Sequence, residues 1–342
     1  MSDEHAQTPQ WFREALAAPV ETGEVDVDGA AIRFRAWGAA GQPGLVLVHG
    51  GAAHSRWWDH IGPQLAGDRR VVALDLSGHG DSDTREHYSL DQWAHEVAAV
   101  ASASGIEGRP VVVGHSMGGI VSFVAADLHG DRLAGVQIVD SPIRQRTPEE
   151  DAARRKAAFG PKKVYPTREE ALARFRFVPP QEAAVPCVRE HVAETSLMAV
   201  EGGWSWKFDP AMFTRSGGDT LAVAVPRCPI AYFRAQHGIV SDELMEQMRE
   251  RFGPSAIVAE IPDAGHHTMI DQPLALITGI RTVLAAWAPP PPDRVSRTCR
   301  QNPALRSASS AQNAGGQGAG SVRVIARVSA AAENCANSSE SR

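Results

Sequence analysis

A serine between closely spaced glycines, at residues 114–118, is the feature of this sequence with the clearest chemical meaning. The run reads Gly-His-Ser-Met-Gly, and the β-branched stretch 111–113 before it is typical of a buried strand. Small and apolar residues follow from 120 to 128, as in a helix that packs on a sheet. A sharp strand–turn–helix connection of this kind, the nucleophile elbow, lifts a serine hydroxyl clear of the sheet. We therefore predict that Ser116 is a nucleophile.

The two glycines of the run, Gly114 and Gly118, have a steric role in this interpretation. A side chain at either position would collide where the strand and the helix cross closely. An ordinary tight turn between a strand and a helix is the alternative explanation. The flanking strand and helix patterns favour the nucleophile elbow.

A serine nucleophile needs a general base, and His266 is the candidate. It lies in the run Asp-Ala-Gly-His-His at 263–267, directly after the last predicted strand. We therefore expect it at the same sheet edge as Ser116. The neighbouring His267 is the competing candidate. His266 is favoured because Gly265 allows a tight turn before it, and His267 is expected to face away.

Backbone N–H groups are expected to bind the oxyanion that forms when a carbonyl is attacked. One is the N–H of Met117, directly after the nucleophile, and the other comes from the His-Gly-Gly-Ala loop at 49–52. Gly51 is the preferred donor in this loop and Ala52 is the second choice. Glycines at this place can also serve only to end a strand, but the His-Gly-Gly sequence favours the oxyanion role.

Four motifs, in this order along the chain, resemble those of the α/β-hydrolase superfamily. They are Leu-Val-His-Gly-Gly at 47–51, Asp-Leu-Ser-Gly-His-Gly-Asp-Ser at 75–82, Gly-His-Ser-Met-Gly-Gly at 114–119 and Gly-His at 265–266. The likeness extends over about residues 22–288 and is greatest to the lidded branch, which contains small esterases, lactonases, haloperoxidase-like enzymes and carbon–carbon bond hydrolases. The resemblance implies an α/β fold with a mostly parallel eight-stranded sheet flanked by helices, an antiparallel second strand, a helical lid insertion and no cofactor.

The acid that would orient the histidine is where the chain departs from most members of this superfamily. They carry it in a Gly-x-x-Asp type loop after the strand that follows the lid, but residues 234–240 contain no carboxylate. Asp140 ends the strand after the nucleophile helix, where some members place the acid. Asp242 is the alternative, in what reads as the first turn of a helix. Asp140 is favoured, although a turn hydrogen bond near Ser141 would also explain a carboxylate there.

Strands and helices that could position these residues alternate along the chain. The predicted strands are 24–28, 32–37, 45–48, 71–74, 111–113, 136–139, 230–233 and 256–261. The predicted helices between and after them are 57–65, 90–103, 120–128, 241–252 and 271–287. Apolar strands that alternate with amphipathic helices imply a parallel sheet covered on both faces.

Shifts in composition divide the chain into segments. Residues 1–21 are predicted to be a helical lead-in, and residues 22–140 and 216–288 to form the hydrolase core. Residues 141–215 show helical patterns and no convincing strand, which suggests a lid over the carboxyl edge of the sheet. The helices expected in this lid are 148–159, 167–177 and 186–200. Residues 289–342 lack aromatic side chains and cannot bury enough apolar surface to offset ordering entropy, so they are predicted to be a disordered tail.

The overall composition is that of an ordinary globular protein. Of 342 residues, 43% are hydrophobic and 22% are charged, and the formal net charge is −6. There is no basic stripe of a nucleic-acid binder, no signal-peptide pattern, and no run near the roughly 18 apolar residues of a membrane span. The four cysteines lack metal-ligand spacing. A reduced, cytoplasmic protein without nucleic-acid or membrane partners is the simplest expectation.

Together these features predict a serine hydrolase, most simply a carboxylesterase, with Ser116, His266 and Asp140 as its triad. Small, fairly apolar ester-like molecules are the expected substrates, cleaved through an acyl-enzyme. Carbon–carbon bond, lactone and amide hydrolysis are alternatives. Thr268 to Ile270 stand where carbon–carbon hydrolases often carry a tryptophan, which disfavours the first of these. A ligand-binding receptor on the same fold is the non-enzymatic alternative.

Several side chains of the predicted lid are candidates for contacts with substrate. Trp204, Trp206 and Phe213 could line the pocket or form a small core of the lid itself. Arg144 and Arg146 could meet a substrate carboxylate, or pair with the acidic run that follows them.

Overall fold

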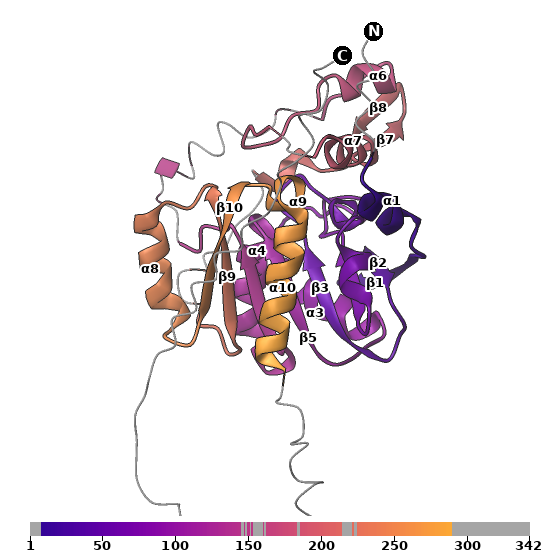
Figure 1. Cartoon of the computed structure of the whole chain (residues 1–342). Coiled ribbons are helices and arrows are strands. Elements are labelled where there is room, and N and C mark those ends of the chain that lie inside the picture. The colour runs from indigo at the N-terminus through magenta and orange to yellow at the C-terminus, as the bar shows by residue number, and fades with distance from the viewer. Residues whose placement is uncertain are drawn as a thin grey trace, which may run out of the picture.

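The computed structural model describes residues 8–288, except 145–146, 148, 151, 153–159, 161, 183–184, 214–220 and 222–223. At its centre is an eight-stranded sheet with the strand order β1-β2-β4-β3-β5-β6-β9-β10 (Figure 1). Its strands are β1 (Glu21–Val27), β2 (Ala30–Trp37), β3 (Gln42–Val48), β4 (Arg70–Leu74), β5 (Ile106–His115), β6 (Gly135–Val139), β9 (Ile230–His237) and β10 (Ile257–Gly265). The α-helices are α1 (Gln10–Ala17), α2 (Gly62–Ala66), α3 (Leu90–Ala103), α4 (Met117–Leu128), α6 (Arg168–Leu172), α7 (Pro186–Thr195), α8 (Asp242–Phe252), α9 (Thr268–Asp271) and α10 (Pro273–Trp287).

The direction of the strands explains where a site can form. Strand β2 runs antiparallel to both β1 and β4, while the other neighbouring strands are parallel. The mostly parallel sheet with an antiparallel second strand is therefore confirmed. Because β3, β5, β6, β9 and β10 all run the same way, the loops after them gather at one edge of the sheet.

Alternation along the strands builds a core on each face of the sheet. In β3, Val46 and Val48 belong to the apolar cluster that includes residues of α3, α4 and α8. Leu45 and Leu47 belong to the other cluster, together with residues of α1, α2 and α10. Figure 1 shows α10 on one side of the sheet and α3 and α4 on the other. A strand segment that is apolar at every position, as residues 45–48 of β3 are, can be buried in this way only between two layers of helices.

The segment between β6 and β9 differs from the expected all-helical lid. Helices α6 and α7 are present but shorter than predicted. The last residues of the predicted helix 186–200 instead form strand β7 (Leu197–Val200). It pairs antiparallel with β8 (Gly203–Trp206). Gly202 and Gly203 have positive φ angles of 82° and 144°, which glycine adopts readily, and they form the turn between the two strands. The expectation of helices alone is wrong at this hairpin, and the predicted helix 148–159 lies largely outside the described residues.

Three other points concern the ends and helices of the chain. The predicted helix 57–65 is divided into the short 3-10 helix Ser55–Trp58 and α2. Residues 1–7 and the tail 289–342 lie outside the described residues. Within the described part of the chain, no helix is long and apolar enough to cross a membrane.

A buried ion pair fastens α3 beneath the loop that follows β4. Glu96 is fully buried on α3, accepts the N–H of Ser77 at 2.8 Å, and pairs with Arg85 Nε at 2.9 Å. Arg85 also donates to the carbonyl oxygens of Val27 and Asp28. Burial raises the pKa of Glu96, because its ionised form is costly to desolvate. The guanidinium therefore compensates a charge that would otherwise be buried without a partner.

We predict that Arg85→Met lowers the free energy of unfolding by about 3 kcal/mol near neutral pH, since it leaves the Glu96 charge unpaired. The folded-state pKa of Glu96 lies above its unfolded value, so the deficit shrinks as pH falls and the carboxyl becomes protonated. Urea denaturation at about pH 8 and about pH 5 measures both effects. The control Arg85→Met/Glu96→Gln should recover most of the loss, and an equal loss in both variants contradicts the argument.

Candidate active site

Ser116 stands alone between the end of β5 and the start of α4. Its φ of 55° and ψ of −121° lie outside the regions that non-glycine residues favour, as a sharp turn at the apex requires. A Cβ at Gly114 would overlap the carbonyl of Gly118, and one at Gly118 would overlap the carbonyls of Val48 and His49. The predicted steric role of both glycines agrees with this packing.

Hydrogen bonds connect this serine to His266, and His266 to Asp140. His266, directly after β10, has its Nε2 3.0 Å from Ser116 Oγ and its Nδ1 2.8 Å from Asp140 Oδ2. Asp140 is fully buried and His266 is 4% exposed. With Nδ1–H donating to the carboxylate, Nε2 is left to accept the serine proton. The residues predicted as nucleophile, base and acid are thus brought together in the order that nucleophilic catalysis requires.

The end of β9 and the loop after it donate hydrogen bonds to the Asp140 carboxylate instead of supplying a carboxylate. Asp140 Oδ2 accepts the N–H of Ile239 at 3.0 Å, and Oδ1 accepts that of Ala235 at 3.3 Å. A Cβ at Gly238 would overlap the Asp140 carboxylate, so a glycine is required for this close approach. Asp242, the alternative acid, lies in the first turn of α8, is 88% exposed and pairs with Arg234.

The expectation that His267 faces away from the site is wrong. It is 5% exposed, lines the cavity beside Ser116, and packs its ring against Trp57 and Phe177. Burial lowers its pKa to about 3, so the ring is neutral near physiological pH. Neither ring nitrogen makes a hydrogen bond of normal geometry with a described residue. His267 is therefore a neutral part of the cavity wall.

Gly51, Ala52 and Met117, the candidate oxyanion donors, all line the cavity with Ser116. Met117 is the first residue of α4, where a backbone N–H has no acceptor within its own helix. Ala52 has a positive φ of 58°, which marks a sharply turned loop after β3. Loop and helix terminus thus flank the serine from two sides.

Buried polar residues hold the neighbouring loops. Asp75 accepts the N–H of Ser55 at 2.6 Å and that of Asp81 at 2.9 Å. His49 Nε2 accepts the N–H of Leu76 at 3.1 Å, which ties the loop after β3 to the loop after β4. Burial lowers the pKa of His49 to about 4, consistent with this acceptor role. These contacts fix the loop at 49–52 without touching the serine.

Two residues that the sequence analysis missed support the histidine loop. Gln181 accepts the N–H of His267 through Oε1 at 2.9 Å and donates through Nε2 to Asp271 at 2.7 Å. Asp271 in turn accepts the N–H of Gly265 at 2.9 Å. The position of Asp271 just after the histidines was the only available signal, because Gln181 is distant in the chain.

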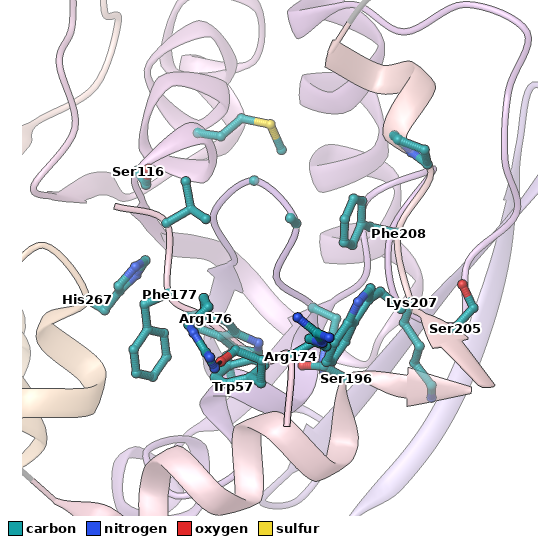
Figure 2. Close-up of a pocket in the computed structure, with 18 of the residues that line it drawn as sticks. Trp57, Ser116, Arg174, Arg176, Phe177, Ser196, Ser205, Lys207, Phe208 and His267 are labelled. Carbon is teal, nitrogen blue, oxygen red and sulfur yellow. Dashed lines mark hydrogen bonds between the residues drawn. The ribbon is translucent and has the colours of Figure 1, made fainter. Parts of the chain in front are cut away.

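A cavity of about 550 Å³ opens beside Ser116, between the sheet edge and the segment that joins β6 to β9 (Figure 2). Trp57, Phe175, Phe177 and Trp206 contribute aromatic surface to it. Of the predicted lid residues, Trp206 lines the cavity, Trp204 is not among its lining residues, and the side chain of Phe213 lies outside the description. This volume lies in the usual range for small-molecule sites, roughly 300–1,000 Å³.

Of the two arginines suggested for substrate binding, the structure describes only Arg144. Arg144 donates to both carboxylate oxygens of Glu150 at 2.6 Å, so it pairs with the acidic run. Arg146 lies outside the described residues.

Within the part of the chain that the structure describes, His115, His266 and His267 are the group whose ring nitrogens could hold a metal, with one atom from each within 4.8 Å of the others. Both nitrogens of His266 are already hydrogen-bonded, to Ser116 and Asp140. His115 Nε2 lies 2.9 Å from the carbonyl of His266. A metal ligated by His266 would therefore displace one of the contacts that connect the serine, histidine and aspartate.

Comparisons with known proteins agree with this architecture. Residues 45–278 match a family described as the alpha/beta hydrolase family. Esterase Rv0045c of Mycobacterium tuberculosis (strain ATCC 25618 / H37Rv) is 28% identical over 269 residues, which cover 75% of this chain and 88% of the esterase. Lipase LipV of the same organism is 24% identical over 271 residues, 74% of this chain and 97% of the lipase. A solved structure of esterase Rv0045c has a TM-score of 0.64 and 26% identity, covering 80% of this chain and 96% of that one.

Substitution of the two candidate acids should affect the rate of serine acylation very differently. Asp140→Asn should lower the rate of serine acylation about 10³- to 10⁴-fold, because the amide no longer holds the imidazole in the tautomer that accepts the serine proton. Asp242→Asn should change it less than about threefold, since an exposed ion pair contributes little. Labelling by a fluorophosphonate probe measures the rate, with circular dichroism melts to establish folding. Near-normal labelling of a folded Asp140→Asn protein would assign the acid elsewhere.

Proposed function

Because this chain belongs to the alpha/beta hydrolase family and is a hydrolase, we propose that it cleaves small carboxylic esters through a serine acyl-enzyme. The observation that carries the proposal is the unbroken hydrogen-bonded series from Asp140 through His266 to Ser116, at the wall of a cavity. The relatives described as an esterase and a lipase act on ester bonds by name and support the same choice.

In the proposed reaction, Ser116 Oγ attacks the ester carbonyl while His266 Nε2 takes its proton. The oxyanion of the tetrahedral intermediate is stabilised by the N–H groups of Met117 and Gly51. His266 then gives the proton to the leaving alcohol as the carbon–oxygen bond breaks. Water, deprotonated by the same imidazole, attacks the acyl-enzyme and releases the acid with the serine restored.

Hydrogen bonds that compensate its buried charge explain why Asp140 suits this reaction cycle. The carboxylate receives hydrogen bonds from two backbone N–H groups and from His266, so its charge is compensated without solvent. A compensated, fixed carboxylate stabilises the imidazolium that forms in each half of the reaction. A serine at the elbow, instead of a carboxylate, disfavours dehalogenase and epoxide-hydrolase chemistry, which in this superfamily rests on a carboxylate there. Lactone, amide and carbon–carbon bond cleavage would use the same residues and are distinguished by substrate.

The test is hydrolysis of p-nitrophenyl esters from acetate to decanoate by the wild type and Ser116→Ala in parallel. We expect turnover by the wild type and a loss of at least about 10³-fold in the variant, since the nucleophile is removed. Fluorophosphonate labelling should occur in the wild type and be absent from Ser116→Ala. A folded wild type that neither turns over any ester nor reacts with the probe would contradict the proposal and favour a binding function.

A further inference from the structure

The cavity beside Ser116 has a strongly cationic lining. Five Lys and Arg residues contribute to it, and none of its described lining residues is Asp or Glu. These five cations are Lys162, Lys163, Arg174, Arg176 and Lys207. The chain as a whole has the opposite balance, with 40 Asp and Glu against 34 Lys and Arg. The cationic lining is therefore a local feature of the cavity and does not follow from the overall charge.

Most of this charge is not neutralised within the described protein. Lys207 donates to Asp81 at 2.6 Å, which offsets its charge. Arg176 donates to the carbonyl oxygens of Ala173 and Phe175, which fix its guanidinium but carry no net charge. Arg174 and Lys163 are exposed and form no ion pair with a described residue. Positive charges around one opening raise the local concentration of anions and speed their association.

The cations and the nucleophile occupy different parts of the cavity. All five belong to the segment between β6 and β9, which Figure 1 shows above the sheet edge, whereas Ser116 lies between β5 and α4. In Figure 2, Ser116 lies at the upper left, Arg176 lies below it beside Phe177, and Arg174 and Lys207 lie further across the view. The cavity lining also includes Phe175 and Phe177, which alternate in sequence with Arg174 and Arg176. An apolar wall next to a cationic region suits a molecule that has both an acyl chain and an anionic group.

We infer that the substrate is an acyl ester or thioester that bears a carboxylate or phosphate remote from the scissile carbonyl, bound by Arg174, Arg176 and Lys163. Arginine suits either anion, because its planar guanidinium donates two parallel hydrogen bonds to paired oxygens. The anion takes no part in bond breaking: water is still added across the acyl bond, as in the proposed function on which this inference rests. The neutral, fairly apolar substrates expected from the sequence would leave these cations without a partner.

Matched substrate pairs test the inference and separate the two anions. Monomethyl glutarate against dimethyl glutarate tests a carboxylate, and butyryl-coenzyme A against S-butyryl-N-acetylcysteamine tests phosphate. The wild type should show kcat/KM at least about tenfold higher for the anionic member of one pair, and the preference should fall with added salt. Arg174→Gln/Arg176→Gln should bring that ratio close to one. The control Arg33→Gln/Arg249→Gln removes two exposed arginines outside the cavity lining and should keep it.

Failure of this inference is distinguishable from failure of the proposed function. Turnover of p-nitrophenyl esters with no preference for either anionic member would overturn the inference and leave the proposed function intact. If no ester is turned over, calorimetric binding to Ser116→Ala decides. Tighter binding of an anionic member than of its neutral partner, lost in the Arg174→Gln/Arg176→Gln background, supports the inference. Equal binding of both members overturns it.

Discussion

The close crossing of α4 over the end of β5 is the constraint on which the rest of the site depends. A single residue, Ser116, separates the strand from the helix. This short connection is possible because Ser116 has a strained backbone and because Gly114 and Gly118 leave room for the neighbouring carbonyls. Such a conformation costs about 1–3 kcal/mol and persists only where the surrounding structure enforces it. Here the enforcement comes from the buried part of β5, residues 110–115, which lies between β3 and β6 with a helix layer on each face. The stability of the sheet thus holds the serine at the cavity wall.

The place of the acid shows how one geometry can be reached from a different strand. A carboxylate at the end of β6 reaches the same imidazole as one after β9 would, because these strands are adjacent and parallel. Strand β9 and the loop after it keep a part in the site, since the N–H groups of Ala235 and Ile239 donate to Asp140 and Gly238 lies close to it. What must be preserved is a compensated negative charge at His266 Nδ1, and two neighbouring strands can divide that task.

The sequence predicted those parts of the structure that depend on local patterns. The turn at Ser116, the strands that carry Asp140 and His266, and the order of the motifs could each be read from short segments. Contacts between distant segments could not. Nothing in the neighbourhood of Gln181 indicates that its amide spans His267 and Asp271. The direction of His267 was misjudged for the same reason, since its position in the cavity wall depends on Trp57 and Phe177 from elsewhere in the chain. The β7–β8 hairpin was missed because two adjacent glycines were given less weight than the apolar periodicity before them.

The structure divides chemistry and selectivity between two parts of the chain. The groups proposed to break the bond come from the sheet edge, where a two-sided core makes their positions insensitive to substitutions at the surface. The aromatic and cationic groups of the cavity come mostly from the segment between β6 and β9, whose own elements are short and whose cavity-lining cations, except Lys207, are exposed. An exposed cation can be exchanged without disturbing a core, whereas Asp140 or Gly118 cannot. Substitutions that alter substrate binding are therefore expected to destabilise the fold least in this segment.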